Sequence, residues 1–192
     1  MKKLITTIAF IALSTVSAKA IDMEMFSLTG GLAANNSIFG GTATQEDYNA
    51  AGTVIETTDK EHGVFTESFG SQFVELGIGR FISVGFEHVP DSISTPTNIN
   101  SGGNAGAGAG ADTANVSVDF NDMNTTYVKL NTPMGIYLKY GAVTTDIDIK
   151  ETMLSGNTYA NTSVDGTSIG AGYQSHIKET GFGIRFEANY VD

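Results

Sequence analysis

The chain has 192 residues, with 21 acidic and 10 basic side chains and a formal charge of −11. It has no cysteine, which excludes a disulfide framework, a thiolate zinc site and a redox thiol. The acidic balance leaves no basic patch to meet phosphates, so it argues against nucleic acid as a partner.

The N-terminus has the pattern of a secretory signal peptide. Lys2 and Lys3 precede residues 4–16, a run without charge, and Ala18-Lys19-Ala20 offers a small-residue cleavage site. We therefore predict a signal peptide over 1–20, with an N-terminal core helix as the alternative. The mature domain, 21–192, would carry seven basic and 21 acidic residues, a formal charge of −14. It contains no apolar run of about 18 residues, so no transmembrane helix is expected.

The mature chain favours strands and turns, because it has 23 glycines, only three prolines and many Thr, Ser and Asn residues. In several segments, apolar residues alternate with polar residues or glycine. A repeat of two residues is the pattern expected for a β-strand. The strands that this pattern predicts cover residues 26–38, 73–78, 82–87, 116–130, 136–142, 169–174 and 181–192. The segments 42–68, 91–114 and 151–166 are predicted as long polar loops, the second of which contains a Gly-Ala-rich stretch over 101–112.

The second and third strands are predicted to form a hairpin, although one long strand is the alternative. A three-residue loop at Gly79-Arg80-Phe81 places the apolar residues of both strands on one face, whereas a two-residue loop would separate them. The predicted cross-strand pairs are Ile78 with Ile82, Leu76 with Val84, and Val74 with Phe86.

The last strand, 181–192, shows the alternation most clearly. Phe182, Ile184 and Phe186 share one face, and Arg185 and Glu187 share the other. A soluble sandwich would bury the apolar face, whereas a membrane barrel would turn it to lipid and enclose the charges. Twelve residues suffice for a tilted membrane-spanning strand, which needs about 9 to 11.

The connections between strands alternate between long and short. Because neighbouring strands are antiparallel, this order places every long loop at one end, as in outer-membrane barrels. We therefore predict an all-β fold, an antiparallel up-and-down transmembrane β-barrel with seven strands visible of an expected eight. A soluble secreted β-sandwich is the alternative.

Seven strands are an odd count, whereas bacterial single-chain barrels have an even number and at least eight. We therefore expect that the last strand is missing, that the chain is C-terminally truncated, and that 181–192 is left as an open edge. Alternatively, a bulge or a split of the first long loop supplies the eighth strand.

The signal peptide, the alternating strand 182–190, the glycine-rich sixth strand and the loop asymmetry together resemble the small outer-membrane β-barrel family. The chain is similar in these features to the OmpA transmembrane domain and to opacity and OmpW-like porin-type proteins. The resemblance is architectural and covers nearly the whole mature chain. It implies the outer membrane of a Gram-negative-type cell as the location and outer-membrane lipid as a partner.

Six charged residues are predicted to point into the barrel. They are Glu75, Glu87, Lys129, Lys139, Arg185 and Glu187. The interior of an eight-stranded barrel is just wide enough for side chains to fill, and buried charges must be paired. We expect a structural network of ion pairs, with a gated ion path through the same charges as the alternative.

Catalytic, cofactor and metal sites are not expected. His88 is the one histidine near the outer rim, and parity places it outside the barrel. Asp146, Asp148 and Glu151 offer hard oxygen ligands for divalent cations, but we favour a solvated acidic surface.

The predicted function is that of a non-catalytic, monomeric outer-membrane scaffold that displays acidic surface loops. The alternatives are a narrow porin-like channel for ions or small solutes, a surface lipid hydrolase or protease, and the soluble sandwich. The residues predicted to face lipid are Leu76, Ile78, Ile82, Val84, Phe86, Ile136, Leu138, Ile169, Tyr173, Phe182, Ile184 and Phe186.

Overall fold

The computed structural model describes residues 5–22, 25–48, 55–102, 112–152, 160–177 and 181–192. They form one antiparallel sheet, which confirms the all-β prediction. Its strands are β1 (Ile5–Asp22), β2 (Phe26–Tyr48), β3 (Ile55–Ile78), β4 (Ile82–Val89), β5 (Ile93–Ser94), β6 (Asn98–Gly102), β7 (Asp112–Asn131), β8 (Ile136–Thr152), β9 (Thr162–His176) and β10 (Phe182–Val191). Within these ranges, no helix is long and apolar enough to cross a membrane.

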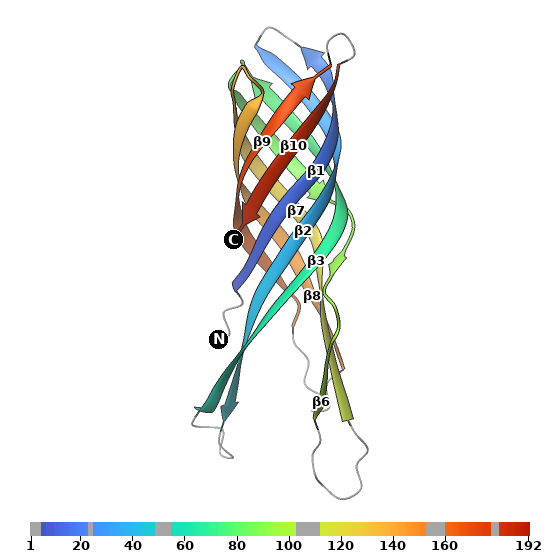
Figure 1. Ribbon diagram of the computed structural model, residues 1–192, viewed down its shortest axis with the longest axis vertical. Coiled ribbons are helices and arrows are strands. Elements are labelled where there is room, and N and C mark those ends of the chain that lie inside the picture. The colour runs from blue at the N-terminus through green and yellow to red at the C-terminus, as the bar shows by residue number, and fades with distance from the viewer. Residues whose placement is uncertain (1–4, 23–24, 49–54, 103–111, 153–159, 178–180) are drawn as a thin grey trace, which may run out of the picture.

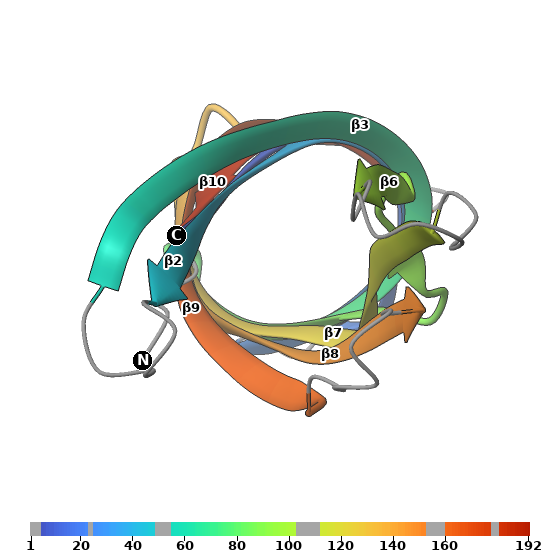
Figure 2. The same ribbon diagram turned by 90° about the horizontal axis from the view of Figure 1, so that it is seen from below.

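The sheet curls into a barrel (Figures 1 and 2). Hydrogen-bonded neighbours follow the order β4-β3-β2-β1-β10-β9-β8-β7, and β4 also pairs with β7, which closes the ring. The two short strands β5 and β6 pair with β7 beyond the end of β4. The antiparallel, up-and-down order of the prediction is therefore confirmed.

All seven predicted strands are present, and they correspond to β2, β3, β4, β7, β8, β9 and β10. The hairpin between β3 and β4 has the predicted register, with Ile78 opposite Ile82, Leu76 opposite Val84 and Val74 opposite Phe86. Gly79 begins the tight connection with a φ of 63°, a left-handed conformation that glycine adopts at little cost.

The eighth position in the ring is held by β1, from the segment predicted to be a signal peptide. It pairs with β2 on one side and with β10 on the other. The expectation that β10 has an open edge is therefore wrong. β1 lies between β2 and β10 and is antiparallel to both. An eighth strand after Asp192 was expected at this position in the ring. Cleavage before Ile21 and a further C-terminal strand stay predictions.

The long polar loop predicted over 42–68 is wrong for residues 42–48 and 55–68, because β2 and β3 continue to pair there as an extended hairpin. Residues 49–54 lie outside the described residues. Side chains join the two strands. Thr42 Oγ1 lies 2.9 Å from His62 Nδ1, and Asn36 donates to Ser68 Oγ at 2.9 Å. Such cross-strand hydrogen bonds support a ladder without apolar alternation. The extension belongs to β2 and β3, so it does not supply a separate eighth strand.

The strand ends that lead into the long connections lie at one end of the barrel, at the bottom of Figure 1. We call this the loop end, and the end with the short β3–β4 and β7–β8 turns the turn end. Most of the Gly-Ala-rich stretch, residues 103–111, lies outside the described residues.

The irregular pattern of the fourth predicted strand results from a β-bulge in β7. The register against β8 shifts between Asn121 and Asn124, and Asp122 has a φ of 48°. The additional residue changes which positions face inward. As a result, both Phe120 and Met123 are buried.

Many large apolar residues of the strands point away from the barrel interior, whereas others, among them Phe39, Phe73 and Phe120, are buried inside it. All twelve residues predicted to face lipid are exposed, with exposed fractions between 41% and 59%. Strand register joins some of them and similar residues into a row across six neighbouring strands, β3, β4, β7, β8, β9 and β10. This row contains Leu76, Val84, Val128, Tyr140, Ile169 and Tyr190. We call these outward apolar residues the belt.

Candidate functional site

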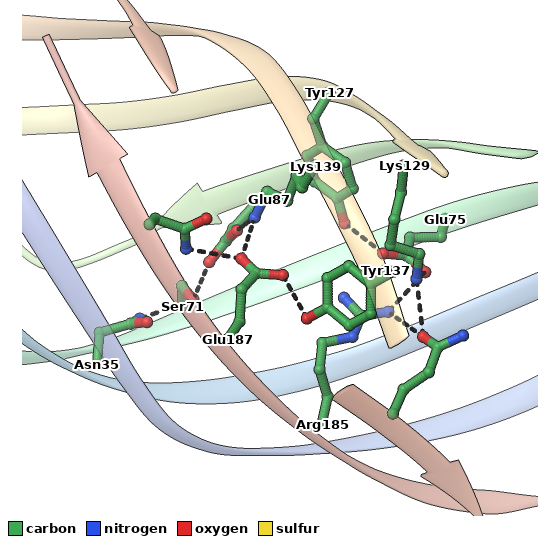
Figure 3. Close-up of polar contacts among 12 residues, drawn as sticks. Asn35, Ser71, Glu75, Glu87, Tyr127, Lys129, Tyr137, Lys139, Arg185 and Glu187 are labelled. Carbon is green, nitrogen blue, oxygen red and sulfur yellow. Dashed lines mark hydrogen bonds and ion pairs between the residues drawn. The ribbon is translucent and has the colours of Figure 1, made fainter. Parts of the chain in front are cut away.

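The six predicted charged residues meet inside the barrel (Figure 3). Glu75 comes from β3, Glu87 from β4, Lys129 from β7 and Lys139 from β8, while β10 supplies both Arg185 and Glu187. Five of them are at least 93% buried, and the side chain of Glu87 is 18% exposed. Alternation explains the placement, because each lies between two outward neighbours on its strand.

One half of the network is centred on the carboxylate of Glu75. Lys129 Nζ and Arg185 Nη2 each lie 2.6 Å from its Oε2 atom, and Tyr127 Oη donates to Oε1 at 2.8 Å. Gln174 Oε1 accepts a second bond from Lys129 at 2.9 Å. This carboxylate thus joins side chains from opposite walls of the barrel.

The other half is centred on the ammonium group of Lys139. Its Nζ atom lies 2.6 Å from Glu187 Oε1 and 2.9 Å from Glu87 Oε2. Ser71 Oγ donates to the second oxygen of Glu87 at 2.6 Å, and Asn35 donates to Ser71 at 2.9 Å. These contacts extend the network toward the loop end.

Two tyrosines connect the halves. Tyr127 donates to Glu75, and Lys139 Nζ lies 4.3 Å from the centre of its ring. Tyr137 donates to Glu187 at 2.6 Å, and Lys129 Nζ lies 4.9 Å from the centre of its ring. Each ring therefore contributes a hydrogen bond to one half and a cation–π contact to the other.

The sequence prediction did not include these tyrosines, although parity could have found them. Tyr127 lies two residues before Lys129, and Tyr137 lies two residues before Lys139, so each shares a face with its lysine. The network holds three carboxylates and three cations, so its charges balance. The two tyrosines add neutral hydrogen-bond donors to Glu75 and Glu187.

A different kind of ion pair lies near the loop end, beyond the belt. Lys150 pairs with Asp119, but the lysine side chain is 66% exposed. The hydrogen bond from Lys150, with one from Ser94, lowers the pKa of Asp119. Solvent screens such pairs, so this one contributes little to stability.

The acidic residues considered for cation binding do not come together as a metal site. Asp146 accepts a hydrogen bond from Ser163 Oγ at 2.6 Å, and Asp148 accepts one from Asn121 at 2.9 Å. Both line an open hollow of about 430 Å³ beside the β7 bulge. Over the part of the chain that the structure describes, no three His, Cys, Asp or Glu side chains are arranged to hold a metal ion.

His88 is half-buried, and its Nδ1 atom lies 2.8 Å from Asn124 Oδ1. It alternates with the inward residues Glu87 and Val89, so it lies on the outer face, as parity predicts.

Glycines on neighbouring strands leave space for the tyrosine rings. A Cβ at Gly172 would overlap Tyr137 Oη and the backbone oxygen of Phe186. We expect Gly172→Ala to lower the free energy of unfolding by about 1–3 kcal/mol, because overpacking shifts a well-packed core. Chemical denaturation measures the loss. Gly63→Ala is the matched control, since nothing lies within 4 Å of its added Cβ. Equal stability of the two variants would contradict the close packing of Tyr137 against Gly172.

These features define a class: an antiparallel all-β barrel with an apolar exterior and a charged interior. No protein-family model matches the chain, and no curated protein matches it.

Among solved structures, the chain is similar to the Salmonella SPI-1 type III secretion injectisome secretin InvG (residues 176-end) in the open gate state, with 8% identity and a TM-score of 0.22. It is also similar to the InvG secretin domain beta-barrel from the Salmonella SPI-1 injectisome NC-base, with 6% identity and a TM-score of 0.14. The matches cover 99% of this chain but only 58% and 60% of those chains.

Proposed function

We propose that this protein is a non-catalytic outer-membrane β-barrel whose strands form a closed scaffold and whose acidic loop end faces the outside of the cell. The observation that carries the proposal is the reversed polarity of the barrel. Aromatic and aliphatic side chains of the belt cover the outside, while Lys129, Lys139 and Arg185 are almost fully buried inside.

A soluble β-protein would have the opposite arrangement. It would keep its lysines in water and would not expose large apolar residues over most of its outer wall. A contiguous exposed apolar band of this kind is unusual for a soluble monomer and marks a membrane or protein contact. Because the belt crosses six of the eight strands in the ring rather than covering one patch, lipid is the partner that fits it best.

Ion pairs that bridge strands across the lumen favour the scaffold over a porin-like channel. The side chains of Glu75 and Arg185 bridge β3 and β10, and Lys139 bridges β4, β8 and β10. An eight-stranded ring has little interior space beyond what such side chains fill. The alternative of a surface hydrolase would need His88 beside a nucleophile such as a serine. The hydrogen-bond partner of His88 Nδ1 is instead Asn124 Oδ1.

The barrel is tested by heat-modifiable gel migration. We expect the purified chain, folded into detergent micelles, to migrate faster in an unheated sample than after boiling, because a closed barrel resists the denaturing detergent. Identical migration in both samples would contradict the barrel, and a soluble sandwich would also dissolve without detergent.

Conductance separates the closed scaffold from the channel. In planar lipid bilayers we expect no discrete current steps from the folded chain, because inward-facing side chains fill the lumen. Regular steps at every insertion would contradict the closed scaffold and would favour the narrow channel.

A further inference from the structure

A second layer fills the barrel interior on the loop side of the charge network. Phe39 of β2 is its centre and is 0% exposed. Its ring stacks on Phe65 with 4.7 Å between centroids and on Phe120 with 5.9 Å. The other buried members are Val89, Ile93, Met123, Val143, Ile147 and Val191. We call this group the aromatic layer.

The aromatic layer spans the barrel from wall to wall. Phe39 lies on β2 and Phe120 on β7, which are separated by β3 and β4 on one side of the ring. The remaining members come from β3, β4, β5, β7, β8 and β10. The layer is therefore built from several sides of the barrel rather than from one wall.

A cavity of about 20 Å³ separates the two layers. Glu87, Lys139 and Asn189 line it on the charged side, and Phe69 and Met123 line it on the apolar side. A space of this size holds about one water molecule. The lining of the lumen thus changes from polar to apolar across this cavity.

We propose that the aromatic layer around Phe39, and not the charge network, is the barrier that keeps ions from crossing the barrel. An ion among Glu75, Glu87 and the lysines meets carboxylates and ammonium groups that can replace its hydration water. The members of the aromatic layer carry no charged group, and the buried hydroxyls of Ser37 and Thr145 beside them are neutral. An ion there therefore loses most of its hydration without compensation. Hydrophobic constrictions close pores in this way by excluding water.

The inference rests on the proposed membrane barrel and is tested in planar bilayers with the full chain. We expect Phe39→Ala to produce current steps at least tenfold more often than the parent, because the missing ring admits water into the aromatic layer. Phe39→Leu, which keeps the position apolar and large, should remain as silent as the parent. Phe81→Ala is the control for loss of an aromatic ring outside the lumen, since Phe81 is 57% exposed in the turn between β3 and β4.

The outcomes separate the two proposals. Every variant is first tested for heat-modifiable migration, and Phe120→Ala replaces Phe39→Ala if the latter does not fold. A parent that is not heat-modifiable contradicts the barrel itself. A folded, silent parent with equally silent Phe39→Ala and Phe120→Ala variants overturns only the aromatic barrier. Tyr137→Phe removes only a hydrogen bond of the charge network. The aromatic barrier is also overturned if Tyr137→Phe produces current steps while the phenylalanine variants remain silent.

Discussion

Replacing Lys139 by Met is expected to lower the free energy of unfolding by about 3–5 kcal/mol, the cost of breaking a buried ion pair. Lys139 is 3% exposed and is the cation that lies between Glu87 and Glu187. Without it, two carboxylates face each other across the lumen with no opposite charge between them. Urea unfolding of the chain folded into lipid vesicles measures the loss.

Lys150→Met is the matched control, because it removes the same group from a pair in which the lysine side chain is 66% exposed. We expect a loss of about 0–1 kcal/mol there. Adding Glu187→Gln to Lys139→Met should recover part of the stability, since it removes one of the unpaired charges. Equal losses in Lys139→Met and Lys150→Met would mean that the interior is solvated and that the network is not buried.

The second large effect is expected on the outside of the barrel. Ile184 is 44% exposed and lies between Phe182 and Phe186 on the outer face of β10. If this face meets lipid, Ile184→Lys places a charge near the middle of the bilayer and should cost about 2–4 kcal/mol. The measurement is again urea unfolding from vesicles.

The control for this prediction is Thr144→Lys, an exposed outward position of β8 beyond the belt toward the loop end. We expect no more than about 1 kcal/mol there, because charges near the interface cost little. A vesicle-folded Ile184→Lys protein as stable as the parent would show that this face does not meet lipid.

The alternation of residue types was sufficient to predict the seven strands and the hairpin register. It also placed Glu75, Lys139 and Arg185 on the inner face, because strand geometry fixes the side on which each residue points. Their partners depend on which strands meet across the ring. The contact between Glu75 and Arg185 spans 110 positions in sequence, so no local pattern could predict it.

The features that sequence reasoning missed depend on irregular or polar strand segments. The bulge at Asn121 reverses the parity of β7, so a strict period of two misplaces the residues around it. The polar extensions of β2 and β3 pair through their backbones and through Thr, Ser and Asn side chains, which gives no apolar signal. Because this region resembled a loop, the aromatic layer around Phe39 and Phe65 was not predicted.

We propose that the apolar outer face of the barrel meets lipid and that the charged inner face does not. The chain has no tryptophan, so a single introduced tryptophan reports its own surroundings. Phe186 is 52% exposed on the outer face, whereas Phe73 is 6% exposed and points into the barrel. The Cζ atom of Arg185 lies 4.5 Å from the centre of the Phe73 ring.

The most direct measurement is the quenching of tryptophan fluorescence by lipids brominated on their acyl chains, in vesicles that contain Phe186→Trp or Phe73→Trp. We predict strong quenching for Phe186→Trp and little for Phe73→Trp, with both variants heat-modifiable. Stronger quenching of Phe73→Trp, or equal quenching of the two, would contradict the reversed polarity on which the proposed function rests.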